Sequence, residues 1–229
     1  MKKEYRTEAK YLLNFQEYYV LKNILSEVMT PDQNGSEKGG YTVKSIYFDS
    51  VENSSYMEKV DGILERKKIR IRSYGLQESD WVKLEIKNKW NAGIYKEVSG
   101  LSKADAEALL RYEAEPLLRY ENKAAQKVYR MMKEDIYRPV VAIDYEREAY
   151  TLPFYEIRIT FDKNLRASVE NLKCMDGSRT YFPVLDNTCI ILEVKYNYYI
   201  PAYIKRILGT VTGVQLSVSK YCMARQLLG

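Results

Sequence analysis

Charged and aliphatic residues alternate along several segments of this chain, and this pattern limits the folds open to it. In the stretch RKKIRIR, residues 66–72, Lys68, Arg70 and Arg72 alternate with Ile69 and Ile71. A β-strand with this sequence has its cations on one face and its isoleucines on the other, because successive side chains point to opposite sides. In an ordinary half-buried strand, the charged face would lie in water.

The same alternation recurs in four further segments, which weakens that ordinary interpretation. The polar sets are Arg6, Glu8 and Lys10 in residues 5–13; Lys83, Glu85 and Lys87 in 82–87; Glu156, Arg158, Thr160 and Asp162 in 156–162; and Glu193 and Lys195, following Ile191, in 190–196. Amphipathic helices are predicted at 15–29, 103–112, 122–135, 201–208 and 219–228, and their apolar faces must cover something. If they cover the aliphatic strand faces, the charged faces meet inside a barrel.

The fold class expected is therefore α+β, with one domain over residues 1–229 built on a large, mostly antiparallel sheet. Further strands are predicted at 42–50 and 92–100, one or two strands at 138–152, and a short irregular or helical connection at 54–64. Turn residues predict a loop at 31–40 and a turn near 75–80. Tyr47 and Asp49 are assigned to the fold.

Composition excludes several kinds of chemistry. The 229 residues include no histidine, so triads and zinc sites that need this residue are excluded. The three cysteines, odd in number and without a CxxC motif, suit reduced thiols in a cytoplasmic protein. We expect no transmembrane segment and no signal peptide. A formal net charge of only +5 does not indicate nucleic-acid binding.

The charges of such an interior indicate the kind of ligand that it would bind. Buried arginines and lysines need counter-anions, and guanidinium groups suit phosphate oxygens. The interspersed glutamates could neutralise some of these cations or hold Mg²⁺ or Mn²⁺, neither of which needs histidine. The residues alone thus predict a tunnel that binds a chain of phosphates together with a divalent metal.

The chain resembles the catalytic domain of the vacuolar transporter chaperone (VTC) complex, a polyphosphate polymerase of the CYTH-like, or triphosphate tunnel metalloenzyme, superfamily. The matching motifs are YRTEAKYLL, SIYFDS, YMEKVDGILERKKIRIRSYG, KLEIK, IYKE, EIRITFDKNLRAS, ILEVKY and LSVSKYCMAR, in the family's order over nearly the whole chain. The resemblance implies an eight-stranded antiparallel β-barrel with a charged interior, flanked by α-helices. It also implies transfer of the γ-phosphate of ATP to a growing polyphosphate chain.

The resemblance also implies roles for individual residues. The phosphate-binding positions matched are Lys10, Arg70, Arg72, Lys83, Lys96, Arg158, Ser219 and Lys220, and Glu193 matches the metal-binding glutamate. Alternation adds Arg6, Lys87 and Lys195 to the substrate face, and Glu8 as a second metal ligand or as an ion-pair partner. Lys68 shares that face but matches no family position, and it is left out of the site. ATP and polyphosphate are the partners implied, with a separately encoded membrane protein as a further one.

Two departures from the family pattern leave the activity open. Glu156 stands where yeast-type members have tyrosine, and Ser217 where they have lysine, so the tunnel is expected to be less positive. No regulatory SPX domain is expected, which suits a stand-alone, bacterial-type member. Hydrolysis of triphosphate or short polyphosphate, and a non-catalytic polyphosphate-binding module, remain alternatives to polymerisation.

Overall fold

Eight long strands form one antiparallel sheet in the computed structural model, which describes residues 6–32, 40–75, 80–90, 93–211, 214–215 and 217–228. In sheet order they are β1 (Thr7–Leu13), β10 (Ile190–Tyr196), β8 (Ile157–Ser168), β7 (Arg138–Leu152), β3 (Tyr41–Asp49), β4 (Arg66–Tyr74), β5 (Trp81–Trp90) and β6 (Gly93–Ser102). Three two-residue strands are added to them: β11 (Val214–Gln215) beside β1, β2 (Thr30–Pro31) beside β7 and β9 (Phe182–Pro183) beside β8. The predicted strands are confirmed, whereas most of the predicted loop at 31–40 and turn at 75–80 lies outside the described residues.

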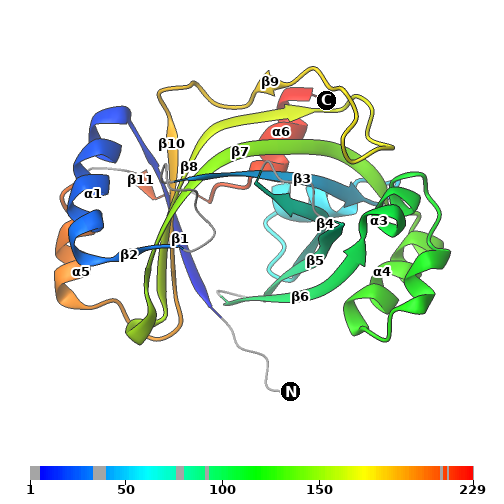
Figure 1. The fold of residues 1–229 in the computed structure, drawn as a ribbon, viewed down its shortest axis with the longest axis horizontal. Helices are drawn as coiled ribbons and strands as arrows, with labels where there is room; N and C mark the ends of the chain where they lie inside the picture. Colours follow the sequence, from blue (N-terminus) through cyan, green and yellow to red (C-terminus); the bar gives the residue numbers. More distant parts are fainter. Residues whose placement is uncertain are drawn as a thin grey trace.

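The sheet curls until its two ends approach each other (Figure 1). Arg6, just before β1, exchanges two backbone hydrogen bonds with Ile94 of β6, at 3.0 and 3.2 Å. The other end of β1 pairs instead with β11, at Tyr11 and Leu12. The expected eight-stranded antiparallel barrel is confirmed as a half-barrel whose edges meet at this bridge.

Within the described residues, six α-helices accompany the sheet: α1 (Phe15–Val28), α2 (Ser54–Val60), α3 (Lys103–Leu110), α4 (Lys123–Glu134), α5 (Ala202–Leu208) and α6 (Lys220–Leu228). Helices α1 and α5 cover the outer face of β1, β10 and β8, and α3 and α4 cover the other flank beside β5 and β6 (Figure 1). Short 3₁₀ turns follow at Glu115–Arg119 and Pro153–Tyr155. No helix within the described ranges has the length and apolarity that a bilayer crossing requires.

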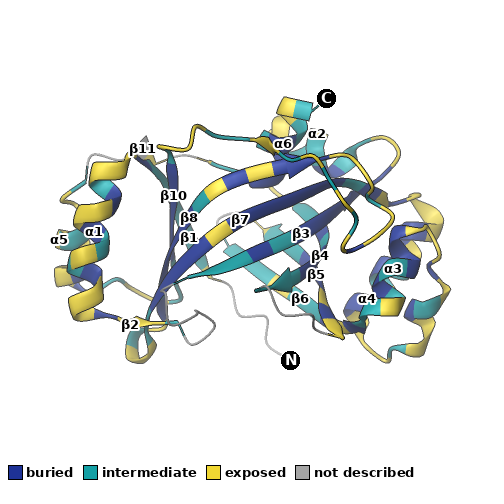
Figure 2. Cartoon of the chain, turned by 45° about the horizontal axis from the view of Figure 1, so that its top comes forward, coloured by how far each residue is buried: buried dark blue, intermediate teal, exposed yellow. Residues whose placement is uncertain are grey.

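The aliphatic strand faces pack outward, beneath the helices. Ile69 and Ile71 of β4 are fully buried in a cluster with Leu84 of β5 and Leu109 of α3. A second cluster joins β1, β8 and β10 to α1, and Figure 2 shows long buried stretches in the strands beside the helices. Burying such side chains contributes about 1.5–3 kcal/mol each. The aliphatic faces of these strands therefore lie outside, and the charged faces of β1, β4, β5 and β10 lie inside.

Helix α6 is different, because it packs on the inner face. Its Tyr221 and Cys222 are buried against Tyr47 of β3 and Ile143 of β7, which share the concave face with the charged residues. The rings of Tyr47 and Tyr221 stack with their centroids 5.3 Å apart. Helix α6 therefore partly fills the half-barrel and brings its first residues into the interior.

Local signals explain where the helices begin. Asn14 and Glu17 form a reciprocal capping box at α1, with N–H···O distances of 3.0 and 2.9 Å. The Ser102 hydroxyl caps α3 by accepting from the backbone N–H of Asp105 at 3.1 Å. The buried side of α1 does not include Phe15 and Tyr19, which are about half exposed, at 51% and 49%.

Candidate active site

A cavity of about 490 Å³ lies on the concave face of the sheet. Its cations are Lys10, Lys59, Arg66, Lys68, Arg70, Arg72, Lys87, Lys89, Arg147, Lys195 and Lys220, and its carboxylates are Glu8 and Glu193. This excess of positive charge exceeds the formal net charge of +5 for the whole chain. Positive charge is therefore concentrated in the cavity.

Strand register explains why these side chains share one face. Arg70 of β4 lies opposite Tyr47 of β3 on one side and Glu85 of β5 on the other. At the far side of the sheet, Lys10 of β1 lies opposite Glu193 of β10. Directly opposed residues in an antiparallel pair point to the same side of the sheet. The alternation seen in single segments thus becomes one continuous charged surface.

The first cluster in this surface is built around Asp162, which is 1% exposed. Arg147 donates to both of its carboxylate oxygens, at 2.6 and 2.8 Å, and the Lys220 ammonium lies 2.6 Å from Oδ2. Burial would raise the pKa of Asp162, but these two cations hold it well below its usual range. Asp162 is therefore ionised and fixes the position of Lys220, the first residue of α6.

The second cluster is built around Glu193, which lies 3.5–3.7 Å from Lys10, Arg147 and Lys195. Burial lowers the pKa of Lys10 to about 8 and that of Lys195 to about 7, despite the neighbouring carboxylates. These two ammonium groups therefore lack enough negative charge around them in the free protein. An anion entering the cavity would raise the pKa of both.

The third cluster is built around Glu85, which is fully buried in β5. Arg70 donates Nε–H to Oε2 at 2.7 Å, and the Lys96 ammonium lies 2.7 Å from Oε1. Burial opposes ionisation, but Arg70, Arg72 and Lys96 hold the pKa of Glu85 well below its usual range. Arg72 is held separately, by Ser45 and by the Tyr145 hydroxyl at 3.0 and 3.1 Å. Glu85 is thus the counter-ion that keeps these cations in place without ligand.

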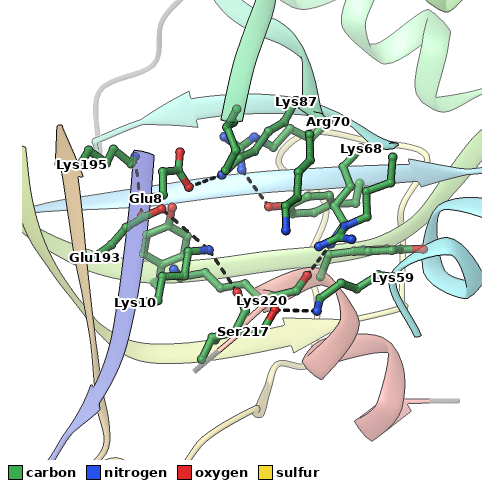
Figure 3. A pocket seen from close by; sticks show the side chains of 18 of the residues that line it. Glu8, Lys10, Lys59, Lys68, Arg70, Lys87, Glu193, Lys195, Ser217 and Lys220 are labelled. Carbon is green, nitrogen blue, oxygen red and sulfur yellow. Dashed lines mark hydrogen bonds and ion pairs between the residues drawn. The ribbon is translucent and has the colours of Figure 1, made fainter. Parts of the chain in front are cut away.

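Nine of the thirteen side chains predicted for the site line the cavity: Glu8, Lys10, Arg70, Arg72, Lys87, Glu193, Lys195, Ser219 and Lys220. Figure 3 shows seven of them converging from β1, β4, β5, β10 and α6. Glu8 of β1 is paired with Lys87 at 2.6 Å. Segments far apart in the sequence therefore contribute to one enclosure.

The other four predicted residues lie outside the cavity lining. Lys96 is engaged by Glu85, and Arg158 is held by Asp32 and by the Tyr41 hydroxyl at 2.8 Å. Lys83 is exposed, with its ammonium 5.2 Å from the centre of the Tyr74 ring. Arg6 is exposed and takes part through its backbone in the bridge that joins the sheet edges.

Sequence reasoning left several lining residues out of the site. Arg66 and Lys89 lie directly opposite each other, one alternation step beyond Lys68 and Lys87, so extending the pattern would have found them. Arg147 stands between two glutamates in the sequence, which is typical of a solvated strand face. Tyr47, assigned to the fold, also lines the cavity. Arg70 and Arg72 lower the pKa of its buried hydroxyl to about 8, although burial itself acts the other way.

The two departures noted in the sequence have different outcomes. Glu156 is exposed, has a left-handed backbone with φ of 51°, and hydrogen-bonds to Asn197. It precedes β8 and does not line the cavity, so its expected effect on the charge of the tunnel is wrong. Ser217 does line the cavity, and its hydroxyl accepts a hydrogen bond from the Lys59 ammonium at 2.8 Å. A cation from α2 therefore reaches the position where the family has lysine.

The donor set suits a divalent metal only in company with phosphate. Among the described residues, no group of three or more acidic or cysteine side chains is placed to hold a metal ion. The cationic neighbours of Glu193 lie farther from its carboxylate than a normal hydrogen bond. Glu8 is two residues from Lys10 on the same strand, and Lys10 lies directly across from Glu193. Magnesium in phosphate-transfer sites is commonly held by one or two carboxylates plus substrate oxygens and water. Glu193 and Glu8 are the carboxylates of the cavity lining that could contribute to such an ion together with substrate phosphate.

Comparison with solved structures shows the fold. The chain is similar to a proposed adenylate cyclase from Bacillus halodurans, with 15% identity, a TM-score of 0.58 and 96% of each chain covered. A proposed adenylate cyclase from Vibrio parahaemolyticus has 12% identity and a TM-score of 0.52, covering 97% of this chain and 98% of its own. A Pyrococcus horikoshii protein has 12% identity and a TM-score of 0.51, covering 98% and 99%.

The sequence comparisons are more specific about the family. No curated protein matches the chain significantly. The VTC domain family matches over residues 5–229, which spans every strand and helix described above. The chain therefore belongs to the VTC domain family.

Proposed function

We propose that this protein is a divalent-metal-dependent polyphosphate polymerase, which transfers the γ-phosphate of ATP to a growing inorganic polyphosphate chain. The observation that supports this most is the concave cavity, where the cations far outnumber the two lining carboxylates in a chain of the VTC family. A ligand that satisfies so many cations at once must be a polyanion, and one that is narrow enough to enter the half-barrel.

The transfer itself demands little covalent chemistry of the protein. A terminal oxygen of the polyphosphate chain forms a bond to the γ-phosphorus of ATP, the bond from that phosphorus to the β–γ bridging oxygen breaks, and ADP leaves. The attacking oxygen is already anionic, so no strong base is needed to activate it. Positioning and charge neutralisation carry the reaction.

The cavity residues divide these tasks. Arg70 and Arg72 project from adjacent inward positions of β4 and would clamp the nucleotide phosphates. Lys10 and Lys220, placed by Glu193 and Asp162, would bind the transferred group and the end of the acceptor chain. Lys83, Lys96 and Arg158 would contact phosphates that extend toward the rim.

Glu193 and Glu8 would hold a Mg²⁺ or Mn²⁺ ion, which when bound would neutralise charge on the phosphate oxygens. The remaining catalytic work belongs to the cations. They hold donor and acceptor in line and stabilise the charge that spreads over the equatorial oxygens of the transferred phosphoryl group.

One observation favours hydrolysis as a second candidate. The cavity lining includes two carboxylates, Glu8 and Glu193, on the paired strands β1 and β10. A lining carboxylate is able to accept a proton from an attacking water molecule. The same cavity would then cleave triphosphate instead of extending a chain.

One assay separates the possibilities. The purified protein is incubated with ATP and Mn²⁺, and in parallel with tripolyphosphate and Mn²⁺, while chain length and free phosphate are measured. The polymerase predicts long chains and ADP from ATP, with loss of both in Lys220→Gln and retention in Lys123→Gln, a surface variant on α4. Release of phosphate without chain growth would support the hydrolase. Tight binding without turnover would contradict both enzymes.

A further inference from the structure

The cavity cations fall into two groups according to their partners. Seven have a carboxylate within 4.0 Å: Lys10, Arg70, Arg72, Lys87, Arg147, Lys195 and Lys220. The other four, Lys59, Arg66, Lys68 and Lys89, form no salt bridge with any described residue; we call them the acid-free end. In Figure 3, Lys59 and Lys68 lie on the opposite side of the cavity from Glu8, Glu193 and Lys195.

The contacts of the acid-free end are with neutral groups. Lys59 donates to the Ser217 hydroxyl at 2.8 Å, and Lys68 donates to the Ser219 hydroxyl at 2.5 Å. Arg66 donates to a backbone carbonyl oxygen in the turn that precedes β4. None of these contacts supplies a negative charge, so no carboxylate of the described residues forms an ion pair with the acid-free end in the free protein.

The four cations are also close enough to affect one another. Arg66 and Lys89 are directly opposed across β4 and β5, and Lys68 is the next inward residue of β4. Burial lowers the pKa of Lys89, and the charges of Arg66 and Lys59 lower it further. Arg66 acts electrostatically on Glu58 of α2, whose carboxylate accepts a hydrogen bond from the backbone of Lys67. Like charges held together in this way are stabilised by an anion that enters from solution.

We propose that the acid-free end is a second phosphate subsite, which binds those phosphates of a polyphosphate chain that extend beyond the acid-paired half of the cavity. The two groups line a single cavity, and Ser217, Ser219 and Lys220 follow one another along the segment that joins them. One chain can therefore contact both. The proposal takes its substrate class from the proposed function and adds that this cavity discriminates polyphosphates by length.

The difference in partners gives the two halves different roles. A phosphate that binds Arg70 or Lys87 competes with Glu85 or Glu8, each of which lies 2.6 Å from its cation. A phosphate that reaches Lys59 or Lys89 displaces no carboxylate of the described chain. Each phosphate added at the acid-free end therefore gains attraction without breaking an ion pair. Affinity should rise with chain length until this end is filled.

The test is equilibrium binding of orthophosphate, pyrophosphate, tripolyphosphate and long-chain polyphosphate, without nucleotide or metal. The variant is Lys59→Gln/Arg66→Gln/Lys89→Gln, in which amide groups keep some hydrogen-bonding capacity while three charges are removed. The matched control is Lys123→Gln/Arg130→Gln/Lys205→Gln, which removes the same charge from exposed positions of α4 and α5. Thermal unfolding of all three proteins establishes that they are folded.

Wild-type protein should bind long chains more tightly than tripolyphosphate. The cavity variant should lose about tenfold in affinity for long chains, corresponding to about 1.4 kcal/mol, because screened charge contacts are individually modest. Its affinity for tripolyphosphate should change less than its affinity for long chains, and the control should resemble wild type for both. The salt dependence of long-chain binding should also become shallower in the cavity variant.

Two outcomes would overturn the proposal: an affinity in wild type that does not rise with chain length, or a cavity variant that loses tripolyphosphate and long chains equally. Both results leave the proposed polymerase standing. Conversely, length-dependent binding that needs Lys59, Arg66 and Lys89, in a protein that makes no polyphosphate from ATP, would support the subsite and reject the polymerase.

Discussion

Glu85→Gln gives a direct measure of how the cavity balances its charge. The Glu85 carboxylate is fully buried, with Arg70 at 2.6 Å and Lys96 at 2.7 Å as its ion-pair partners. The neutral amide is nearly the same size but leaves these cations without a counter-ion. Removing one partner of a buried pair costs about 3–5 kcal/mol. For a chain of this size, that corresponds to a fall in Tm of roughly 6–20 °C.

Polyphosphate should restore part of this loss. Any ligand that binds only the folded state stabilises it, by about 2.7 kcal/mol at a concentration a hundred times its Kd. Without Glu85, Arg70 and Lys96 have no carboxylate competing for them, so the variant should bind tripolyphosphate more tightly than wild type does. The rise in Tm on adding tripolyphosphate, measured by calorimetry, should therefore be larger for Glu85→Gln.

Glu148→Gln is the matched control. Glu148 is also buried and pairs with Lys163 at 2.5 Å and Lys22 at 3.0 Å, but on the outer face beneath α1. This variant should lose stability in the same way and gain no more from tripolyphosphate than wild type does. The reasoning is refuted if Glu85→Gln gains no more than wild type, or if Glu148→Gln gains as much.

Three further predictions concern proton uptake on binding, the contacts of Asp49 with α2 and α6, and the cap of α3. Binding of tripolyphosphate near pH 8 should take up roughly one proton, because Lys195 and Lys10, with pKa values of about 7 and 8, regain charge beside the anion. Affinity should then fall as pH rises through this range, and calorimetry that shows no dependence on buffer ionisation enthalpy would contradict this. Asp49→Asn should lower the free energy of unfolding by about 2–3 kcal/mol, because the buried carboxylate accepts hydrogen bonds from backbone N–H groups of α2 and from the Tyr221 hydroxyl of α6. An unchanged midpoint of urea unfolding would rule this out. Ser102→Ala should lower the free energy of unfolding by about 1 kcal/mol, because it removes the cap of α3. An unchanged midpoint in the same urea assay would contradict this.

The sequence predicted the inner face wherever alternation was regular. Arg70 and Arg72 show why: period-two placement decides the face of a strand, and the surrounding helices decide which face is outside. Individual side-chain contacts could not be predicted from the sequence, because they depend on which residues of neighbouring strands are paired. The pairing of Arg147 with Asp162 across β7 and β8 is one example, and β7 also carries an irregularity near Asp144 that shifts its register.

Residues near the ends of elements were harder to place than those within strands. Lys59 reaches the cavity from the last turn of α2, and no strand pattern predicts that. Glu156 continues the alternation of β8 in the sequence, yet the chain turns there with a positive φ and directs it outward. Alternation in the sequence therefore does not predict the direction of a side chain at the residue where the strand ends.

The central claim is that the concave cavity binds polyphosphate through Arg70 and Arg72, and equilibrium binding of tripolyphosphate tests it most directly. The variant is Arg70→Gln/Arg72→Gln, compared with Arg130→Gln/Arg206→Gln, which removes the same charge from the exposed faces of α4 and α5. Loss of two charge-assisted contacts of about 1.5 kcal/mol each predicts a fall in affinity of about a hundredfold in the cavity variant and little change in the control. A folded cavity variant that binds tripolyphosphate as tightly as wild type would contradict the claim.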